Sequence, residues 1–160
     1  MLQRIFRTAD DKTLTIVRLA LGVVFFAHGA QKVLGWFGGA GFTATLNGFT
    51  QHIGIPLPLA LLAIAAEFLG GLGLILGFLG RIAAFGIAFE MTVAMLMIHR
   101  HFGLFMNWAG KQQGEGFEFH LLAIAIGLLV LVKGSGAVSL DRLLSTSGDK
   151  EKGSNLRAAA

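Results

Sequence analysis

The 160-residue chain contains no cysteine and no tyrosine, and it has only two prolines. Without cysteine it can form no disulfide, no thiolate nucleophile and no cysteine-ligated zinc or iron–sulfur centre. Any thiol redox chemistry would therefore belong to a partner protein. Because 14 phenylalanines accompany the two tryptophans, the aromatic residues are almost all apolar, and only Trp36 and Trp108 can act as amphipathic anchors at a membrane interface.

Charge is also scarce. Charged residues make up 14% of the chain and hydrophobic residues 54%, whereas an ordinary soluble domain has about 25% charged residues. A soluble domain of this length could not bury so much apolar surface. The composition argues against a soluble enzyme, a disordered chain or a coiled coil, and it predicts one small integral membrane domain. The net charge of +4 comes without a basic stripe that alternates with aromatic residues, so no nucleic-acid partner is expected.

The apolar residues fall into four runs; the first is long enough to cross roughly 30 Å of hydrocarbon as a helix, and the fourth is rather short. The runs cover residues 14–34, 57–79, 82–98 and 117–132. Between the first two runs, apolar residues recur at helical spacing, which predicts a short helix lying in the membrane interface. The members of this stripe are Phe42, Leu46, Phe49 and Ile53. A polar, glycine-containing loop is expected between the third and fourth runs.

These runs predict an all-α fold, an integral membrane four-helix bundle with a short interfacial helix between helices 1 and 2. The expected organisation is a cytoplasmic N-terminal segment at residues 1–13, the membrane domain at 14–142 and a disordered cytoplasmic tail at 143–160. A glycine pattern in the second run, at Gly70, Gly71 and beyond, suits close packing of one helix against another.

The distribution of lysine and arginine predicts how the chain is oriented in the membrane. Four crossings place both termini on one side, and that side carries nine basic residues against three on the other. The positive-inside rule then places both termini in the cytoplasm. The nine are Arg4, Arg7, Lys12, Arg81, Lys133, Arg142, Lys150, Lys152 and Arg157, and the three are Lys32, Arg100 and Lys111.

Three charged residues lie well inside the predicted spans, away from the ends that hold Lys32 and Glu118, where one unpaired charge costs about 2.5–3.5 kcal/mol or more. Arg18 lies in the first run, Glu67 in the second and Glu90 in the third. Such residues are expected to face the interior of the bundle and to find partners there. Two interpretations remain open: an ion pair that fixes helix packing, and a proton relay.

On the predicted topology, the histidines gather towards the outer half of the membrane. With Lys32, Glu67 and Glu118, all of them except His52 form a candidate ligand-binding set, since imidazole, ammonium and carboxyl groups can hydrogen-bond a quinone head group. The alternative is that each histidine is simply half-hydrated at the interface. No metal site is predicted, because His99 and His101 form the only close pair. The candidates are His28, Lys32, Glu67, His99, His101, Glu118 and His120.

Several motifs occur in a fixed order along the chain. They are RLALGVVFFAHGAQK at 18–32, EFLGG at 67–71 with Gly77 and Arg81 after it, GFE at 116–118, GSG at 134–136 and SLD at 139–141. Together they resemble the DoxX family of small membrane proteins over roughly residues 14–142. The resemblance implies a four-helix protein of the bacterial inner membrane, whose recurrent polar positions correspond here to Arg18, His28, Lys32, Glu67, Arg81 and Glu118.

The resemblance also narrows the functional hypotheses. Some DoxX-like proteins are small subunits of a thiosulfate:quinone oxidoreductase, and others accompany oxidative-stress or quinone-detoxification systems. The leading hypothesis is a component of such a quinone-linked system that binds a quinone, with haem as a second choice of cofactor, or that supports a redox partner. The alternative is a non-catalytic adaptor that recruits or stabilises a partner enzyme. A small-solute permease ranks third, since four helices would need to form a homodimer for alternating access.

Overall fold

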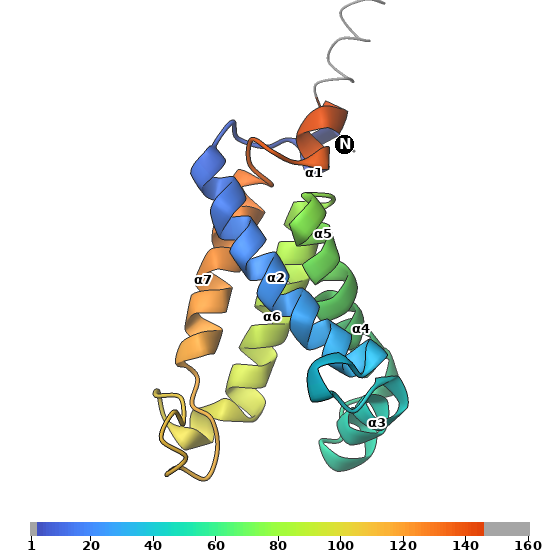
Figure 1. Ribbon diagram of the computed structural model, residues 1–160, viewed down its shortest axis with the longest axis vertical. Helices are drawn as coiled ribbons and strands as arrows, with labels where there is room; N and C mark the ends of the chain where they lie inside the picture. The colour runs from blue at the N-terminus through green and yellow to red at the C-terminus, as the bar shows by residue number, and fades with distance from the viewer. Residues whose placement is uncertain (1–2, 146–160) are drawn as a thin grey trace, which may run out of the picture.

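The computed structural model describes residues 3–145, and every regular element within this range is helical. Four long helical segments form a bundle (Figure 1). They are α2 (Lys12–Leu34), a segmented helix made of α4 (Leu57–Ala65), η3 (Ala66–Gly70) and α5 (Gly71–Leu76), α6 (Gly80–Met97) and α7 (Glu118–Lys133). The short elements are α1 (Gln3–Phe6), η1 (Trp36–Gly38), α3 (Phe42–Asn47), η2 (Gly48–His52) and η4 (His99–Phe102). The predicted all-α four-helix bundle, with a short helix between helices 1 and 2, is confirmed.

The lengths of these helices agree with a membrane location. Within the described residues, three helical segments are long and apolar enough to cross a membrane, at 12–34, 57–76 and 80–97. Helix α7 has 16 residues, which is shorter than the other three. Large apolar side chains also point outward: Leu122 is 66% and Val132 68% exposed. Such a surface would be unstable in water and is expected where a helix faces lipid.

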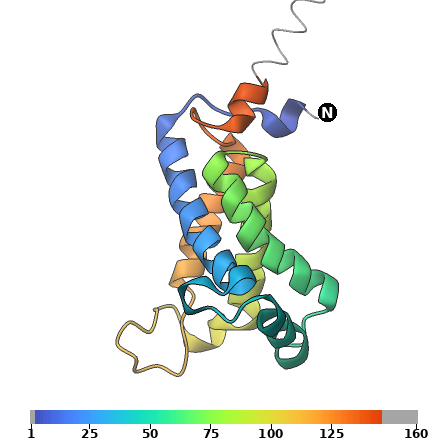
Figure 2. The ribbon, with the colours of Figure 1, turned by 45° about the vertical axis from the view of Figure 1, so that its right-hand side comes forward.

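The four long segments are arranged in two tightly packed pairs. Helix α6 packs along α7, and α2 packs along α5 and η3. In Figures 1 and 2, α2 runs diagonally across the bundle, and the described N- and C-terminal segments meet at the same end of the molecule. We call this the terminal end, and we call the other end, which carries α3 and the loop before α7, the loop end.

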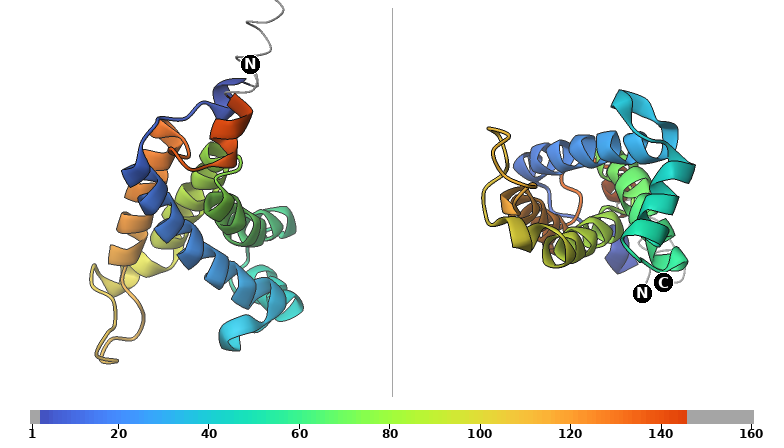
Figure 3. Two further views of the ribbon diagram at one scale, coloured as in Figure 1. Left: turned by 45° about the horizontal axis from the view of Figure 1, so that its top comes forward. Right: turned by 90° about the horizontal axis from the view of Figure 1, so that it is seen from below.

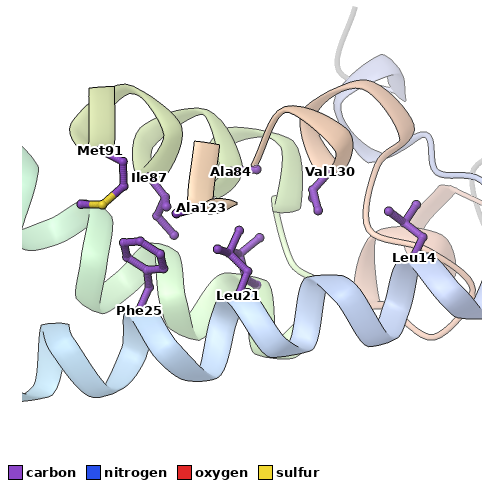
Figure 4. Close-up of a cluster of buried hydrophobic side chains, with 9 residues drawn as sticks. Leu14, Leu21, Phe25, Ala84, Ile87, Met91, Ala123 and Val130 are labelled. Atoms are coloured by element: carbon purple, nitrogen blue, oxygen red, sulfur yellow. The ribbon is translucent and has the colours of Figure 1, made fainter. Parts of the chain in front are cut away.

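The core is a strip of buried apolar side chains between α2, α6 and α7. Alanines on α6 and α7 allow the helices to approach closely, while larger side chains from α2 fill the space between them (Figure 4). Phe25 of α2, which is 1% exposed, lies with Met91 towards the end of this strip that is away from Leu14 (Figure 4). The buried residues are Leu14, Leu21, Phe25, Leu74, Ala84, Ile87, Met91, Ala123 and Val130.

Two glycines let α2 and the segmented helix cross at backbone contact distance. A Cβ atom at Gly29 would lie 2.4 Å from the Cα of Phe68, and one at Gly71 would lie 2.4 Å from the backbone nitrogen of Phe26. Neither position can hold a larger residue without movement of backbone. The close approach occurs beside η3, which is a π-helical turn. Such turns shift the direction of the side chains that follow.

Some predicted boundaries differ from those observed, for local reasons. Helix α2 begins at Lys12 rather than 14, because the Asp11 carboxylate accepts hydrogen bonds from the backbone N–H groups of Thr13 and Leu14. The second long segment ends at Leu76 rather than 79, since Gly77 adopts a left-handed conformation with φ 65°. Of the tail predicted to be disordered at 143–160, residues 143–145 are helical, and the rest lies outside the described residues.

Candidate functional site

At the terminal end, Arg18 caps the end of α5. Its side chain is only 1% exposed. The guanidinium donates hydrogen bonds to the carbonyl groups of Leu74, of Ile75 at 3.1 Å and of Val138 at 2.8 Å. The last carbonyls of a helix have no partner within the helix. Arg18 therefore satisfies backbone groups that would otherwise be buried without hydrogen bonds.

Asp141 performs the complementary task at the start of α6. Its carboxylate accepts hydrogen bonds from the backbone N–H of Leu79 at 2.8 Å, from that of Gly80 at 2.9 Å and from the Ser135 hydroxyl at 2.6 Å. Asp141 is 1% exposed and interacts electrostatically with Arg18. A residue from the C-terminal segment thus provides the helix cap that no residue before α6 supplies.

Arg81 also hydrogen-bonds backbone groups at the terminal end. It donates hydrogen bonds to the carbonyl groups of Leu131 and Val132 near the end of α7, and to the carbonyl of Arg7 at 3.0 Å. As with Arg18, its partners are backbone carbonyl groups. The three charged residues Arg18, Arg81 and Asp141 therefore tie helix ends together, and their observed contacts are structural.

The predicted grouping of Arg18 with Glu67 and Glu90 is not what the structure shows. Arg18 contacts the end of α5, whereas Glu67 lies beside Lys32, which is 14 residues further along α2 and so roughly 20 Å away along the helix axis. The sequence placed Arg18 inside a span but could not indicate at which level of the bundle its partners lie.

Towards the loop end, three ionisable side chains from three helical segments meet. The ammonium group of Lys32 on α2 forms an ion pair with the carboxylate of Glu67 on η3, whose side chain is only 6% exposed. Glu90 on α6 interacts electrostatically with both of them and hydrogen-bonds to Glu67. We call Lys32, Glu67 and Glu90 the charge cluster. Unlike Arg18 and Asp141, its members pair with one another and cap no helix.

Local backbone features set the position of the charge cluster. Glu67 lies in the π-helical turn η3, and Gly29 lets this turn approach α2 at contact distance. Lys32 follows Gly29 by three residues and reaches the same turn. One buried oxygen atom of Glu90, Oε2, has no hydrogen-bond partner within the described residues. The cluster therefore retains a buried acceptor that is available to a proton or to a donor on a ligand.

A second polar group lies at the start of α7. The rings of His99 and His120 lie against each other, with centroids 4.1 Å apart and planes tilted by 39°, and Nδ1 of His99 hydrogen-bonds the Glu115 carbonyl at 2.8 Å. His120 is 5% exposed, and its buried Nδ1 has no partner within the described part of the chain. The ring of His28, which is exposed, lies 6.2 Å from that of Phe119. We call His99 and His120 the histidine pair.

Two other predicted ligands have different surroundings. Glu118 accepts hydrogen bonds from the Met106 N–H at 2.9 Å and from the Trp108 indole N–H at 3.2 Å, so it anchors the loop before α7. His101 is exposed on η4. Among the residues that the structure describes, no three histidine, aspartate or glutamate side chains are grouped so that they could hold a metal ion. The seven predicted ligand residues thus form two polar groups, a loop anchor and two exposed histidines.

Sequence reasoning gave Asp141 no role, although it is among the most deeply buried charged residues. The available signal was its position: a single carboxylate in a short segment that is rich in valine and leucine, at 138–144, shortly after a glycine-rich segment. Its partners, Leu79 and Gly80, are about 60 residues away in the chain, and only the folded structure brings them together.

Comparison with known proteins gives a consistent family pattern. A family model described as DoxX matches residues 13–100. The chain is 28% identical to "Inner membrane protein YqjF" of Escherichia coli (strain K12) over 137 residues, which cover 85% of this chain and 95% of that protein. It is 27% identical to "Inner membrane protein YphA" of the same strain over 139 residues, or 86% and 94% of the two chains.

A third relative comes from another bacterium. An uncharacterized protein of Haemophilus influenzae is 30% identical over 133 residues, which cover 80% of this chain and 87% of that protein. No solved structure matches the chain. The similarity extends across nearly the whole length of each relative, so it includes both ends of the bundle.

Proposed function

Because this chain belongs to the DoxX family and is similar to inner-membrane proteins along most of its length, we propose that it is a component of a quinone-linked oxidoreductase or oxidative-stress system of the bacterial inner membrane. In this role the charge cluster binds the quinone head group. The electrons come from a partner protein.

The observation that carries this proposal is the meeting of Lys32, Glu67 and Glu90 within the bundle, with Glu67 buried and the other two half-buried. Each ionisable group inside a membrane helix is expensive, at about 2.5–3.5 kcal/mol or more when unpaired. The ion pair between Lys32 and Glu67 offsets that cost for two of the groups, but it does not explain Glu90. Helix packing alone needs no third ionisable group, whereas a site that binds a polar head group or moves protons does.

The chemistry of the cluster suits a quinone. Reduction of a quinone to a quinol takes up two electrons and two protons. An ammonium group such as that of Lys32 can donate a hydrogen bond to a quinone carbonyl, and carboxyl groups such as those of Glu67 and Glu90 can hold protons and pass them on. The isoprenoid or other apolar tail of the quinone would lie against the lipid-facing helices.

The electrons must be supplied from outside the chain. It contains no cysteine, so a reduced flavin or dithiol of a partner enzyme is the reductant that the proposal requires. The partner would release two electrons, the cluster would transfer two protons, and the quinol would leave into the bilayer.

The proposal is tested by binding. Purified protein in detergent is titrated with a short-chain benzoquinone while its thermal unfolding is followed, and the lipid extract of the purified protein is searched for quinone. A ligand that binds only the folded state raises the melting temperature with concentration. We expect such a rise for the wild type and a smaller one for Glu90→Gln and Lys32→Met.

The matched control is His52→Gln, since His52 is also a titratable residue but is exposed at the end of η2. It should keep the wild-type response to quinone. Absence of stabilisation at high quinone concentration, together with absence of quinone in the extract, would exclude quinone binding by this protein.

A second function, that of a non-catalytic adaptor, is favoured by one feature of the terminal end. A groove of about 560 Å³ lies there between α2, α5 and the C-terminal segment, and apolar side chains such as Val138 and Leu140, 68% and 41% exposed, border it. Isolation in mild detergent distinguishes the two functions. A partner enzyme bound in stoichiometric amount to a chain without quinone supports the adaptor.

The orientation is part of the proposal. The described N- and C-terminal segments lie at one end of the bundle (Figure 1), and this is the end that is rich in basic residues by sequence. We place it in the cytoplasm. A green fluorescent protein fused to the C-terminus should then fluoresce, and alkaline phosphatase fused at the same place should be inactive.

A further inference from the structure

The loop that joins η4 to α7, residues 103–117, presents large apolar side chains to its surroundings. Leu104 is 42%, Phe105 66% and Trp108 87% exposed. Figure 2 shows this loop extending from the loop end of the bundle. The sequence predicts a polar loop here, and for a loop in water three neighbouring exposed apolar side chains, two of them aromatic, would be unfavourable.

Two carboxylates bind backbone and indole N–H groups of the same loop, while the polar residues at its tip, 111–113, are exposed. The Glu118 carboxylate accepts the backbone N–H of Met106 at 2.9 Å and the indole N–H of Trp108 at 3.2 Å, and the Glu115 carboxylate accepts the backbone N–H of Asn107 at 2.6 Å. Backbone hydrogen bonds also join the two ends of the loop. Internal satisfaction of backbone groups is what non-helical backbone needs when little water is available.

The length of α7 places this loop within the depth of the membrane. Sixteen residues rise about 24 Å, whereas the hydrocarbon layer is about 30 Å thick. The C-terminal end of α7 is fixed at the terminal end, where the Lys133 carbonyl accepts the N–H of Ala9. If this end lies at the interface, α7 ends about 6 Å before the opposite edge of the hydrocarbon, and the loop fills the remaining depth.

Aromatic residues elsewhere at the loop end also indicate that this end lies at the membrane interface. Trp36 and Phe37, in the turn after α2, are 52% and 70% exposed. In Figure 1 the loop and the α3 segment extend to a similar level, and Figure 3 shows them at opposite edges of this end. Tryptophan and neighbouring aromatic residues at one level of a membrane protein are typical of an interfacial belt.

We propose that residues 103–117 bind the lipid surface: the loop lies in the headgroup and upper acyl-chain layer of the bilayer, with Leu104, Phe105 and Trp108 against lipid. Glu115 and Glu118 are positioning residues that hold the backbone and the Trp108 indole in this arrangement. The partner is lipid because the exposed aromatic side chains lie at the depth in the bilayer that the length of α7 gives this loop. This inference is independent of the quinone proposal.

The chain has only two tryptophans, which makes the test direct. Trp36→Phe leaves Trp108 as the only tryptophan, and Trp108→Phe leaves Trp36. Each variant is reconstituted into phosphatidylcholine vesicles, either plain or brominated on the acyl chains, and tryptophan emission is measured with and without iodide in the water. We expect brominated lipid to quench Trp108 to an extent similar to Trp36, and iodide to quench it only weakly.

Strong quenching of Trp108 by iodide with no effect of brominated lipid would overturn the proposal. It would show that the loop lies in water, as expected for a surface that binds a partner protein. Both variants replace exposed residues by another aromatic residue, so the bundle should fold, and circular dichroism checks that it does.

The positioning role is tested by Glu118→Gln in the Trp36→Phe background. The amide cannot accept both hydrogen bonds as strongly as the carboxylate, so iodide quenching of Trp108 should increase severalfold. Lys111→Gln, at the exposed tip of the same loop, is the control and should change nothing. The same Glu118→Gln change in the Trp108→Phe background should leave Trp36 unaffected, which shows that the bundle is intact. Unchanged Trp108 quenching would refute the role of Glu118.

Discussion

The two ends of the bundle use buried charge in different ways. At the terminal end, the side chains of Arg18 and Asp141 contact backbone carbonyl and N–H groups at the ends of α5 and α6. Towards the loop end, Lys32 and Glu67 contact each other, and Glu90 faces both. The first arrangement completes the hydrogen bonding of helix ends. The second arrangement satisfies no backbone hydrogen-bonding group.

This difference separates structural charges from functional candidates. The burial of a charged side chain that caps a helix has a structural reason, because removal of the side chain leaves backbone groups without hydrogen-bond partners. A charge that only faces other charges needs another reason to be buried. Removing charge at the terminal end should therefore reduce stability. Replacing Glu90, the member of the charge cluster that lies outside the ion pair, should instead reduce function.

The largest effect is expected for Asp141→Ala. It leaves the N–H groups of Leu79 and Gly80 without acceptors and Arg18 without a nearby negative charge, which should cost about 3–5 kcal/mol of the free energy of unfolding. Unfolding in mixed detergent micelles measures it. Asp10→Ala is the control, since Asp10 is exposed and its ion pair with Arg142 lies at the surface; it should cost about 0–1 kcal/mol. Equal effects would remove the distinction between the ends.

The next largest effect concerns the close crossing that positions the cluster. Gly29→Ala places a Cβ atom against the backbone of Phe68, and this overpacking should cost about 1–3 kcal/mol. It should also disturb the neighbouring pair of Lys32 and Glu67, and so weaken quinone stabilisation. Gly48→Ala meets open space and has a helical backbone, so it should be neutral or stabilise by about 0.4–1 kcal/mol. A harmless Gly29→Ala would contradict the observed crossing.

A smaller effect, with opposite sign, is expected within the cluster. Glu90→Gln replaces a carboxyl group that faces Glu67 by an amide, which can donate a hydrogen bond to the Glu67 carboxylate without taking up a proton, so the free energy of unfolding should stay the same or rise by about 1 kcal/mol. Glu67→Gln instead leaves Lys32 without its ion-pair partner and should destabilise the protein. The same unfolding assay compares both variants. Strong destabilisation by Glu90→Gln would make Glu90 a structural residue.

The smallest effect is the coupling between the two ends. Arg18→Gln and Glu67→Gln change residues that share no partner and lie roughly 20 Å apart along α2. Their effects on the free energy of unfolding should add to within about 0.3–0.5 kcal/mol in the double variant. A coupling energy well above this value would indicate that Arg18 and Glu67 interact directly.

Much of the fold could be read from residue periodicity. The low charge content and the apolar runs were enough to predict four helices, and the stripe from Phe42 to Ile53 was enough to predict the short helix between the first two. The segmented course of the second helix was not predicted, because the π-helical turn at Ala66–Gly70 has no sequence signature. The sequence predicts only a polar loop before α7, since nothing in the composition of the loop shows that Glu118 binds its backbone.

The sequence by itself determined that this protein is a small helical membrane bundle of the DoxX family and which few ionisable residues lie within it. Only the tertiary structure decided which of them act as caps and which form a cluster. The physical reason is that hydrophobic periodicity depends on neighbours in the chain, whereas the role of a buried charge depends on the groups it contacts. Asp141 meets Leu79 and Gly80, and Lys32 meets Glu67; folding alone brings these distant segments together.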